Sequence, residues 1–125
     1  MKFSTFMSIV AVVALLFGLS FLLMPVQTMA MYGTNLDVSG QYVARYFGSA
    51  FLGLAVILWM AKSGKPKEGA VKGIVLGGFV TTLTGFVASL FDKFYGVGNS
   101  MVWLTVVLYF LFAVGFGYYQ FGKSS

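Results

Sequence analysis

Four long apolar segments dominate this chain, and short polar stretches separate them. The segments cover about residues 3–24, 41–61, 69–91 and 99–121. A helix needs about 20 mostly apolar residues to cross the hydrocarbon of a bilayer, and each segment is long enough. Their only charged residues are Arg45 and Lys72, each near an end. The sequence therefore predicts an all-α integral membrane bundle of four helices in a single domain, 1–125.

The ends of the segments agree with this prediction. Pro25 ends the first segment because proline cannot continue a helix, and Asn99 or Ser100 is a suitable N-cap for the fourth. Lys2, the first apolar run and the small-residue stretch 28–30 also resemble a secretory signal peptide. The apolar region of a signal peptide spans only about 7–15 residues. We therefore expect residues 3–24 to be a retained first span.

Composition excludes several classes of function. The chain of 125 residues is 59% hydrophobic and 9% charged, against about a quarter charged in soluble domains. It has no Cys and no His, which removes disulfides, thiolate nucleophiles and the usual zinc and haem ligands, so we expect no cofactor and no metal. The net charge of +5 comes from loops and ends, with the aromatic residues inside apolar runs. Nucleic-acid binding is therefore not expected.

The distribution of basic residues predicts the orientation. With four spans, the two termini and the loop after the second span share one side. The basic residues of that side are six, namely Lys2, Lys62, Lys65, Lys67, Lys72 and Lys123. The other side has two, Arg45 and Lys93. Because Lys and Arg accumulate in cytoplasmic loops, we expect both termini in the cytoplasm.

The third segment carries small residues at every fourth position along its length. These are Gly69, Gly73, Gly77, Thr81, Gly85 and Ser89. Small residues at this spacing let membrane helices approach closely. The other segments have shorter pairs of the same kind, which are Ala14 with Gly18, Ala44 with Gly48, Ser49 with Gly53 and Ala113 with Gly117. We expect the face of Gly73, Gly77 and Gly85 to meet another helix, from this chain or from a second one.

Arg45 is the most suggestive charged residue, since it lies about one turn inside the second segment, where ionisable groups are costly and often functional. Three interpretations are open. Arg45 pairs with Asp37 or Asp92, it extends to lipid phosphate, or it forms an anion or quinone headgroup site with Tyr42 and Tyr46.

The loop after the second segment has a basic cluster, consisting of Lys62, Lys65, Lys67 and Lys72. Such clusters attract anionic lipid at about 1 kcal/mol per charge. We expect this cluster to set the topology of the chain and to face lipid headgroups.

One tyrosine is expected at the bilayer centre. Tyr109 lies in the middle of the fourth segment, at the depth of Thr81, Thr82 and Thr84 if the last two spans are antiparallel neighbours. A phenol without a partner is costly in hydrocarbon. We therefore expect its hydroxyl to bond to one of these threonines or to a backbone carbonyl beside them.

The sequence gives little support to a function in transport or catalysis. Proton-coupled transport normally needs an acid or a histidine inside a span, and the first, third and fourth segments contain neither. The small multidrug resistance transporters depend on a glutamate in the first span, which this chain lacks. Asp37, Glu68 and Asp92 occupy separate loops and form no acid–base pair. We expect no enzyme.

Several short stretches resemble one group of bacterial membrane proteins. They are Leu22-Leu-Met-Pro-Val, Met31-Tyr-Gly and Ala44-Arg-Tyr-Phe-Gly-Ser-Ala-Phe-Leu-Gly-Leu-Ala, within about residues 15–61. The pattern resembles the DoxX-like and related small four-helix families of unknown function. The resemblance implies a four-helix bundle in a bacterial inner membrane with no established chemistry, and it marks Arg45.

Two functions remain. The first is a non-catalytic accessory or scaffold subunit that packs through its glycine-rich helices against a larger membrane complex or against itself, in contact with membrane lipid. The second is a small oligomeric transporter or a lipid- or quinone-binding membrane protein.

Overall fold

The computed structural model describes residues 2–96 and 98–122, and Lys123 lies outside them. Four long helices, α1 (Phe3–Leu23), α3 (Val38–Ala61), α4 (Gly69–Phe94) and α5 (Met101–Phe121), account for most of the chain. A short helix, α2 (Pro25–Ala30), follows α1. Each long helix is long and apolar enough to cross a membrane, and no strand occurs among the described residues. The prediction of an all-α membrane bundle of four helices is confirmed.

The observed boundaries of the helices have local causes. Helix α1 ends before Met24, where the backbone turns (φ −137°, ψ 61°), and Pro25 is the first residue of α2. Helix α3 begins three residues before the predicted 41, because the Asp37 carboxylate accepts a hydrogen bond from the Gly40 N–H at 2.7 Å. Helix α4 runs three residues past the predicted 91. The six-residue α2 was not predicted.

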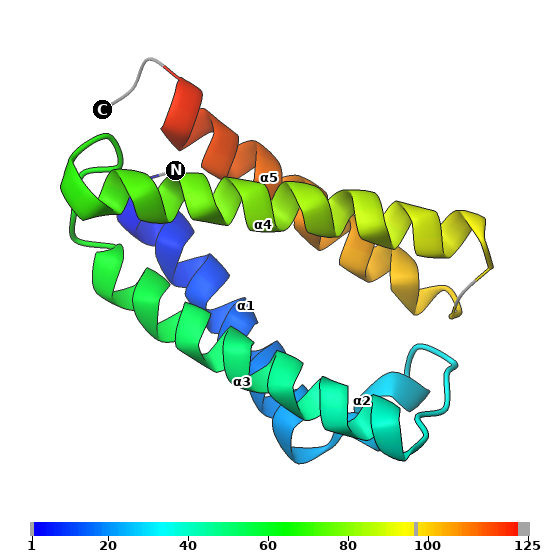
Figure 1. Ribbon diagram of the computed structural model, residues 1–125. Coiled ribbons are helices and arrows are strands. Elements are labelled where there is room, and N and C mark those ends of the chain that lie inside the picture. Colours follow the sequence, from blue (N-terminus) through cyan, green and yellow to red (C-terminus); the bar gives the residue numbers. More distant parts are fainter. Residues whose placement is uncertain (1, 97, 123–125) are drawn as a thin grey trace.

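The four long helices form two hairpin-like pairs that diverge from one end of the molecule (Figure 1). Helix α1 packs along α3, and α4 packs along α5, whereas contacts between the pairs are few. The N-terminus, the loop between α3 and α4 and the end of α5 lie together at one end, which we call the terminal end. Helix α2 lies at the opposite end, the α2 end.

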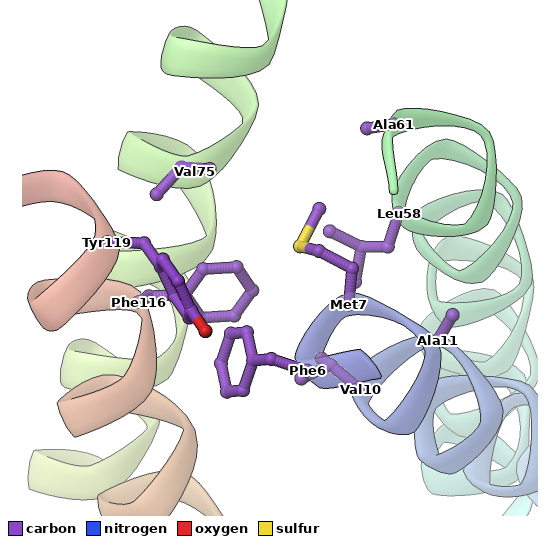
Figure 2. Packing of buried hydrophobic residues seen from close by; sticks show 9 residues of the cluster. All are labelled: Phe6, Met7, Val10, Ala11, Leu58, Ala61, Val75, Phe116 and Tyr119. Carbon is purple, nitrogen blue, oxygen red and sulfur yellow. The ribbon is translucent and has the colours of Figure 1, made fainter. Parts of the chain in front are cut away.

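The apolar core joins the two pairs at the terminal end. Figure 2 shows Phe6 and Met7 of α1 between Leu58 of α3 on one side and Phe116 of α5 on the other. The Phe6 and Phe116 rings meet edge to face with centroids 5.0 Å apart. Val75 of α4 completes this cluster and, like Met7, is fully buried. Because all four long helices contribute, this core holds the pairs together at the terminal end while they separate further along.

Helices α1 and α3 touch through two glycines. A Cβ on Gly48 would lie 2.7 Å from the Gly18 carbonyl oxygen, and a Cβ on Gly18 would lie 3.0 Å from the Gly48 oxygen. Ala14 and Ala44 are buried beside them. The small pairs of the first two spans therefore do bring two backbones into contact. The other small pair of α3 does not, since Ser49 is exposed and nothing lies within 4 Å of a Cβ on Gly53.

Within this chain, the first half of the predicted packing face of α4 meets no other helix, so contact with a second chain stays a prediction. Nothing lies within 4 Å of a Cβ on Gly69, Gly73 or Gly77, and Thr81 is exposed. A four-residue step turns a helix by about 40° more than a full turn, so the stripe winds from the outer face towards α5. Only its last members, Gly85 and Ser89, pack inward.

The face of α4 that meets α5 has alternating spacings of three and four residues. Its members are Val75, Gly78, Thr82, Gly85 and Ser89, which are buried or half-buried. This spacing follows the helix period more closely and keeps its residues on one side. A Cβ on Gly78 would lie 2.5 Å from the Phe116 ring, and one on Gly85 would lie 2.5 Å from the Tyr109 ring. Aromatic rings of α5 therefore pack directly against glycines of α4.

Candidate functional site

A partly open cavity of about 240 Å³ lies between the two helix pairs, beyond the core of the terminal end. All four long helices and the segment around α2 contribute to its walls. The cavity exists because the pairs are held together at the terminal end and diverge from it (Figure 1). Cavities of this kind, mostly apolar with few polar groups, are typical small-molecule sites.

The two walls of the cavity differ in chemistry. The wall from α1 and α3 is entirely apolar and is rich in phenylalanine, with Phe17 and Phe21 from α1 and Phe47 and Phe51 from α3. Every polar side chain of the cavity comes from outside α1 and α3, and we call these residues the polar wall. These come from α4, α5 and the segment after α2, and they are Tyr32, Thr34, Thr81, Thr82, Ser89, Asp92, Thr105 and Tyr109. A ligand in the cavity would meet an apolar side and a polar side.

Most of the hydroxyl groups on the polar wall are already hydrogen-bonded within the protein. Thr82 donates to the Gly78 carbonyl at 2.7 Å, and Ser89 donates to the Phe86 carbonyl at 3.0 Å. The Thr34 hydroxyl donates to the Met29 carbonyl at 3.1 Å. These three hydroxyls give their protons to backbone oxygens and leave none for a ligand.

Tyr109 differs from these residues. Its ring packs against Gly85, and its side chain is half-buried on the cavity wall. Within residues 2–96 and 98–122, its hydroxyl has no hydrogen-bond partner. Neither the predicted bond to a threonine nor the predicted bond to a backbone carbonyl beside it is formed among the described residues. The Thr82 hydroxyl donates to the Gly78 carbonyl, and the Thr84 hydroxyl donates to the Val80 carbonyl at 2.8 Å. Both threonines therefore bond to backbone oxygens of α4 itself.

The α2 end of the cavity is bounded by hydrogen bonds between the two helix pairs. The Asn99 backbone N–H donates to the Tyr32 carbonyl at 2.8 Å, and its side-chain amide donates to the Met31 carbonyl at 3.1 Å. The Tyr32 and Thr105 hydroxyls bond at 3.0 Å. Gly98 permits this close approach, since a Cβ there would lie 3.0 Å from the Tyr32 oxygen. We call these contacts the α2 junction.

The residues predicted around Arg45 do not form one site. Tyr46 donates to the Tyr42 hydroxyl at 3.1 Å, and both rings are exposed beside Arg45 on the outer face of α3. Asp37 caps α3, and Asp92 lines the cavity. In the part of the chain that the structure describes, Arg45 forms no ion pair with either acid. The ion-pair interpretation is wrong. A headgroup site on this face could include Arg45, Tyr42 and Tyr46, but neither Asp37 nor Asp92 belongs to it.

The lysine cluster at the terminal end is partly engaged within the protein. Lys67 donates a hydrogen bond to the Gly122 carbonyl, which ties the loop between α3 and α4 to the end of α5. The Lys62 ammonium lies 3.4 Å from the centre of the Trp59 ring, a cation–π contact. Lys65 and Lys72 are exposed. These two remain the clearest candidates for contact with lipid headgroups.

The cavity is the feature that sequence reasoning missed. Its polar boundary depends on residues far apart in the chain, such as Tyr32 and Thr105, which are separated by 73 positions. A usable signal was the spacing of phenylalanines on the first two spans, because Phe17 and Phe21, like Phe47 and Phe51, are four residues apart and share a helix face.

Known proteins add no information about this site. Neither protein-family models, nor curated proteins, nor solved structures match this chain.

Proposed function

We propose that this chain is a non-catalytic membrane protein that binds a lipophilic small molecule between its two helix pairs. The cavity carries this proposal, because all four spans build it and one of its walls is wholly apolar. Its volume of about 240 Å³ suits a ring or a short length of hydrocarbon chain, and it is too small for another helix. The ligand would enter from the membrane, where such molecules are concentrated.

The proposal includes the location and the orientation of the chain. The six-to-two distribution of basic residues supports cytoplasmic termini, and the resemblance to DoxX-like families supports a bacterial inner membrane. The terminal end with its core would then face the cytoplasm, and the α2 junction would face the opposite side.

A second candidate function is association with a larger membrane complex or with another copy of the chain, as an accessory subunit. The outer face of α4 favours it, since a methyl group on Gly69, Gly73 or Gly77 would have no neighbour within 4 Å. Gly77→Leu should then reduce co-purification or self-association without unfolding the chain. Unchanged assembly in that variant would remove this candidate.

Hydrophobic photolabelling tests the main proposal. The protein, reconstituted in phosphatidylcholine nanodiscs, is irradiated with an uncharged aryl diazirine, and the labelled peptides are identified by mass spectrometry. We expect saturable labelling of Phe51 and Leu108 on the cavity walls. The substitution Val13→Trp should abolish the labelling of these two residues, because Val13 lines the cavity and an indole would fill the space.

The matched control is Leu16→Trp on the same helix. Leu16 is 61% exposed and lies outside the cavity, so this variant should be labelled like the parent protein. Labelling restricted to outward residues in all three proteins would contradict the proposal.

A further inference from the structure

The chemistry of the cavity walls narrows the class of ligand. Five of the eight polar residues on the polar wall use their side-chain oxygen in a bond that the protein already makes, namely Tyr32, Thr34, Thr82, Ser89 and Thr105. Thr81 is exposed at the edge of the cavity. The bond between Tyr32 and Thr105 uses only one of their two hydroxyl protons, so one of these residues keeps a proton to donate. Tyr109 differs from both, because its half-buried hydroxyl on the cavity wall makes no hydrogen bond within the described residues.

A donor without a partner in an apolar cavity selects for an oxygen that accepts its proton. The group is costly to leave unsatisfied, and water is scarce at this depth of a bilayer. The position of the Tyr109 ring is set by Gly85, against which it packs, so the donor is held on the wall. A carbonyl oxygen of the ligand would satisfy it.

The wall opposite Tyr109 determines the body of the ligand. Phe17, Phe21, Phe47 and Phe51 offer ring faces and edges and no hydrogen bond. The rings of Phe21 and Phe47 meet edge to face at 5.2 Å, and those of Phe47 and Phe51 at 4.5 Å, so they form one continuous aromatic surface. Such a surface packs well against a flat ring or an unbranched chain.

The charge at the cavity disfavours an anionic ligand. Asp92 lines the polar wall, and no lysine, arginine or second carboxylate among the described residues does so. The ammonium of its neighbour Lys93 donates to the Asn99 carbonyl at 3.3 Å in the α2 junction, and Lys93 does not line the cavity. The Asp92 carboxylate is exposed, so its repulsion of a phosphate or a fatty-acid anion would be modest.

We infer that the cavity takes an uncharged amphipathic molecule, with a carbonyl oxygen on the Tyr109 hydroxyl and an apolar body against the four phenylalanines. This inference rests on the proposed function, since it names the ligand class of the same cavity. The carbonyl has two possible sources in a membrane, a quinone ring and the acyl ester of a neutral lipid.

Competition against the diazirine label tests the inference in nanodiscs. The competitors are a decyl-tailed benzoquinone, dioleoylglycerol, dodecane and decanoate. We expect the benzoquinone or dioleoylglycerol to protect Phe51, and the one that protects identifies the source of the carbonyl. For that competitor, Tyr109→Phe should raise the concentration that halves the labelling of Phe51 about tenfold, as expected for one lost hydrogen bond. Protection by dodecane should not change, since dodecane has no acceptor.

Two further variants complete the test. Tyr118→Phe, an exposed tyrosine of the same helix outside the cavity, should behave like the parent protein. Asp92→Asn should improve protection by decanoate. The inference is overturned if dodecane protects but Tyr109→Phe leaves the carbonyl compounds unaffected, or if decanoate protects the parent protein as well as they do. If none of the competitors protects, the proposed function fails as well.

Discussion

At the scale of single residues, neighbouring glycines of α4 have opposite roles. Gly78 faces α5, where a methyl group would lie 2.5 Å from the ring of Phe116, which is 1% exposed. Gly77 faces outward, with nothing within 4 Å. The difference arises because adjacent residues of a helix point about 100° apart. One glycine permits a close contact, and the other does not touch the rest of the chain.

This pair makes a sharp prediction about stability. Gly78→Ala should lower the free energy of unfolding by about 1–3 kcal/mol, because the buried Phe116 ring has no room to move away. Gly77→Ala should leave it unchanged or slightly raise it, since alanine favours a helix more than glycine does. Unfolding in mixed detergent, followed by circular dichroism, measures both. Equal losses in the two variants would contradict the packing described for α4.

The sequence was a poor guide to these residues for a physical reason. A regular run of small residues every four positions is conspicuous, but a helix has 3.6 residues per turn, so the run does not stay on one face. The true contact face combines Gly78 and Gly85 with Val75, Thr82 and Ser89, which share no chemical type. Only the position of α5 reveals that they belong together.

At the scale of helices, the long elements were predictable and the short one was not. The spans follow from long apolar runs, which must form helices in lipid so that every backbone group is bonded. Helix α2 has six residues and no such requirement. Its position depends on side-chain contacts with α1, where the Thr28 hydroxyl donates to the Ser20 carbonyl at 3.1 Å. The residues just after α2 add bonds to a distant part of the chain, since the carbonyls of Met31 and Tyr32 accept from Asn99.

The α2 junction should control the separation of the two helix pairs. Asn99→Ala removes the side-chain bond to the Met31 carbonyl and the cap on the Met101 N–H, which lies 2.9 Å from the Asn99 side-chain oxygen. Each bond is worth about 1 kcal/mol. We expect a longer and broader distance distribution between spin labels at Gln27 and Phe94, two exposed positions on opposite pairs.

Asn35→Ala is the control for this variant. Asn35 is exposed and makes none of the junction bonds, so its replacement should leave the distance unchanged. If Asn99→Ala also leaves the distance unchanged, the junction does not hold the pairs together.

At the scale of the whole molecule, the orientation in the membrane can be tested directly, because the chain contains no cysteine. A cysteine introduced at Ser63, in the loop between α3 and α4, should resist a membrane-impermeant maleimide in intact cells. A cysteine at Ser39, near the start of α3, should react. Both serines are exposed in the structure, so access depends on the side of the membrane. The reverse pattern would overturn the proposed orientation.

The arrangement of the two pairs was beyond sequence reasoning for a different reason. The number of spans and their order along the chain leave open how the pairs meet. That depends on where the bulky groups accumulate, and here Phe6, Met7, Leu58 and Phe116 gather at the terminal end. The cavity follows from this distribution, because the space between Phe51 and Tyr109 is left open by the described side chains.

Native mass spectrometry of the protein extracted from its own membrane tests most directly whether the cavity holds a ligand. We expect the parent protein and Leu16→Trp to retain one small uncharged molecule per chain. Val13→Trp, whose indole occupies the cavity, should fold normally and carry none. Identical spectra for the three proteins, with no bound molecule or with the same one in all of them, would contradict a ligand site between the helix pairs.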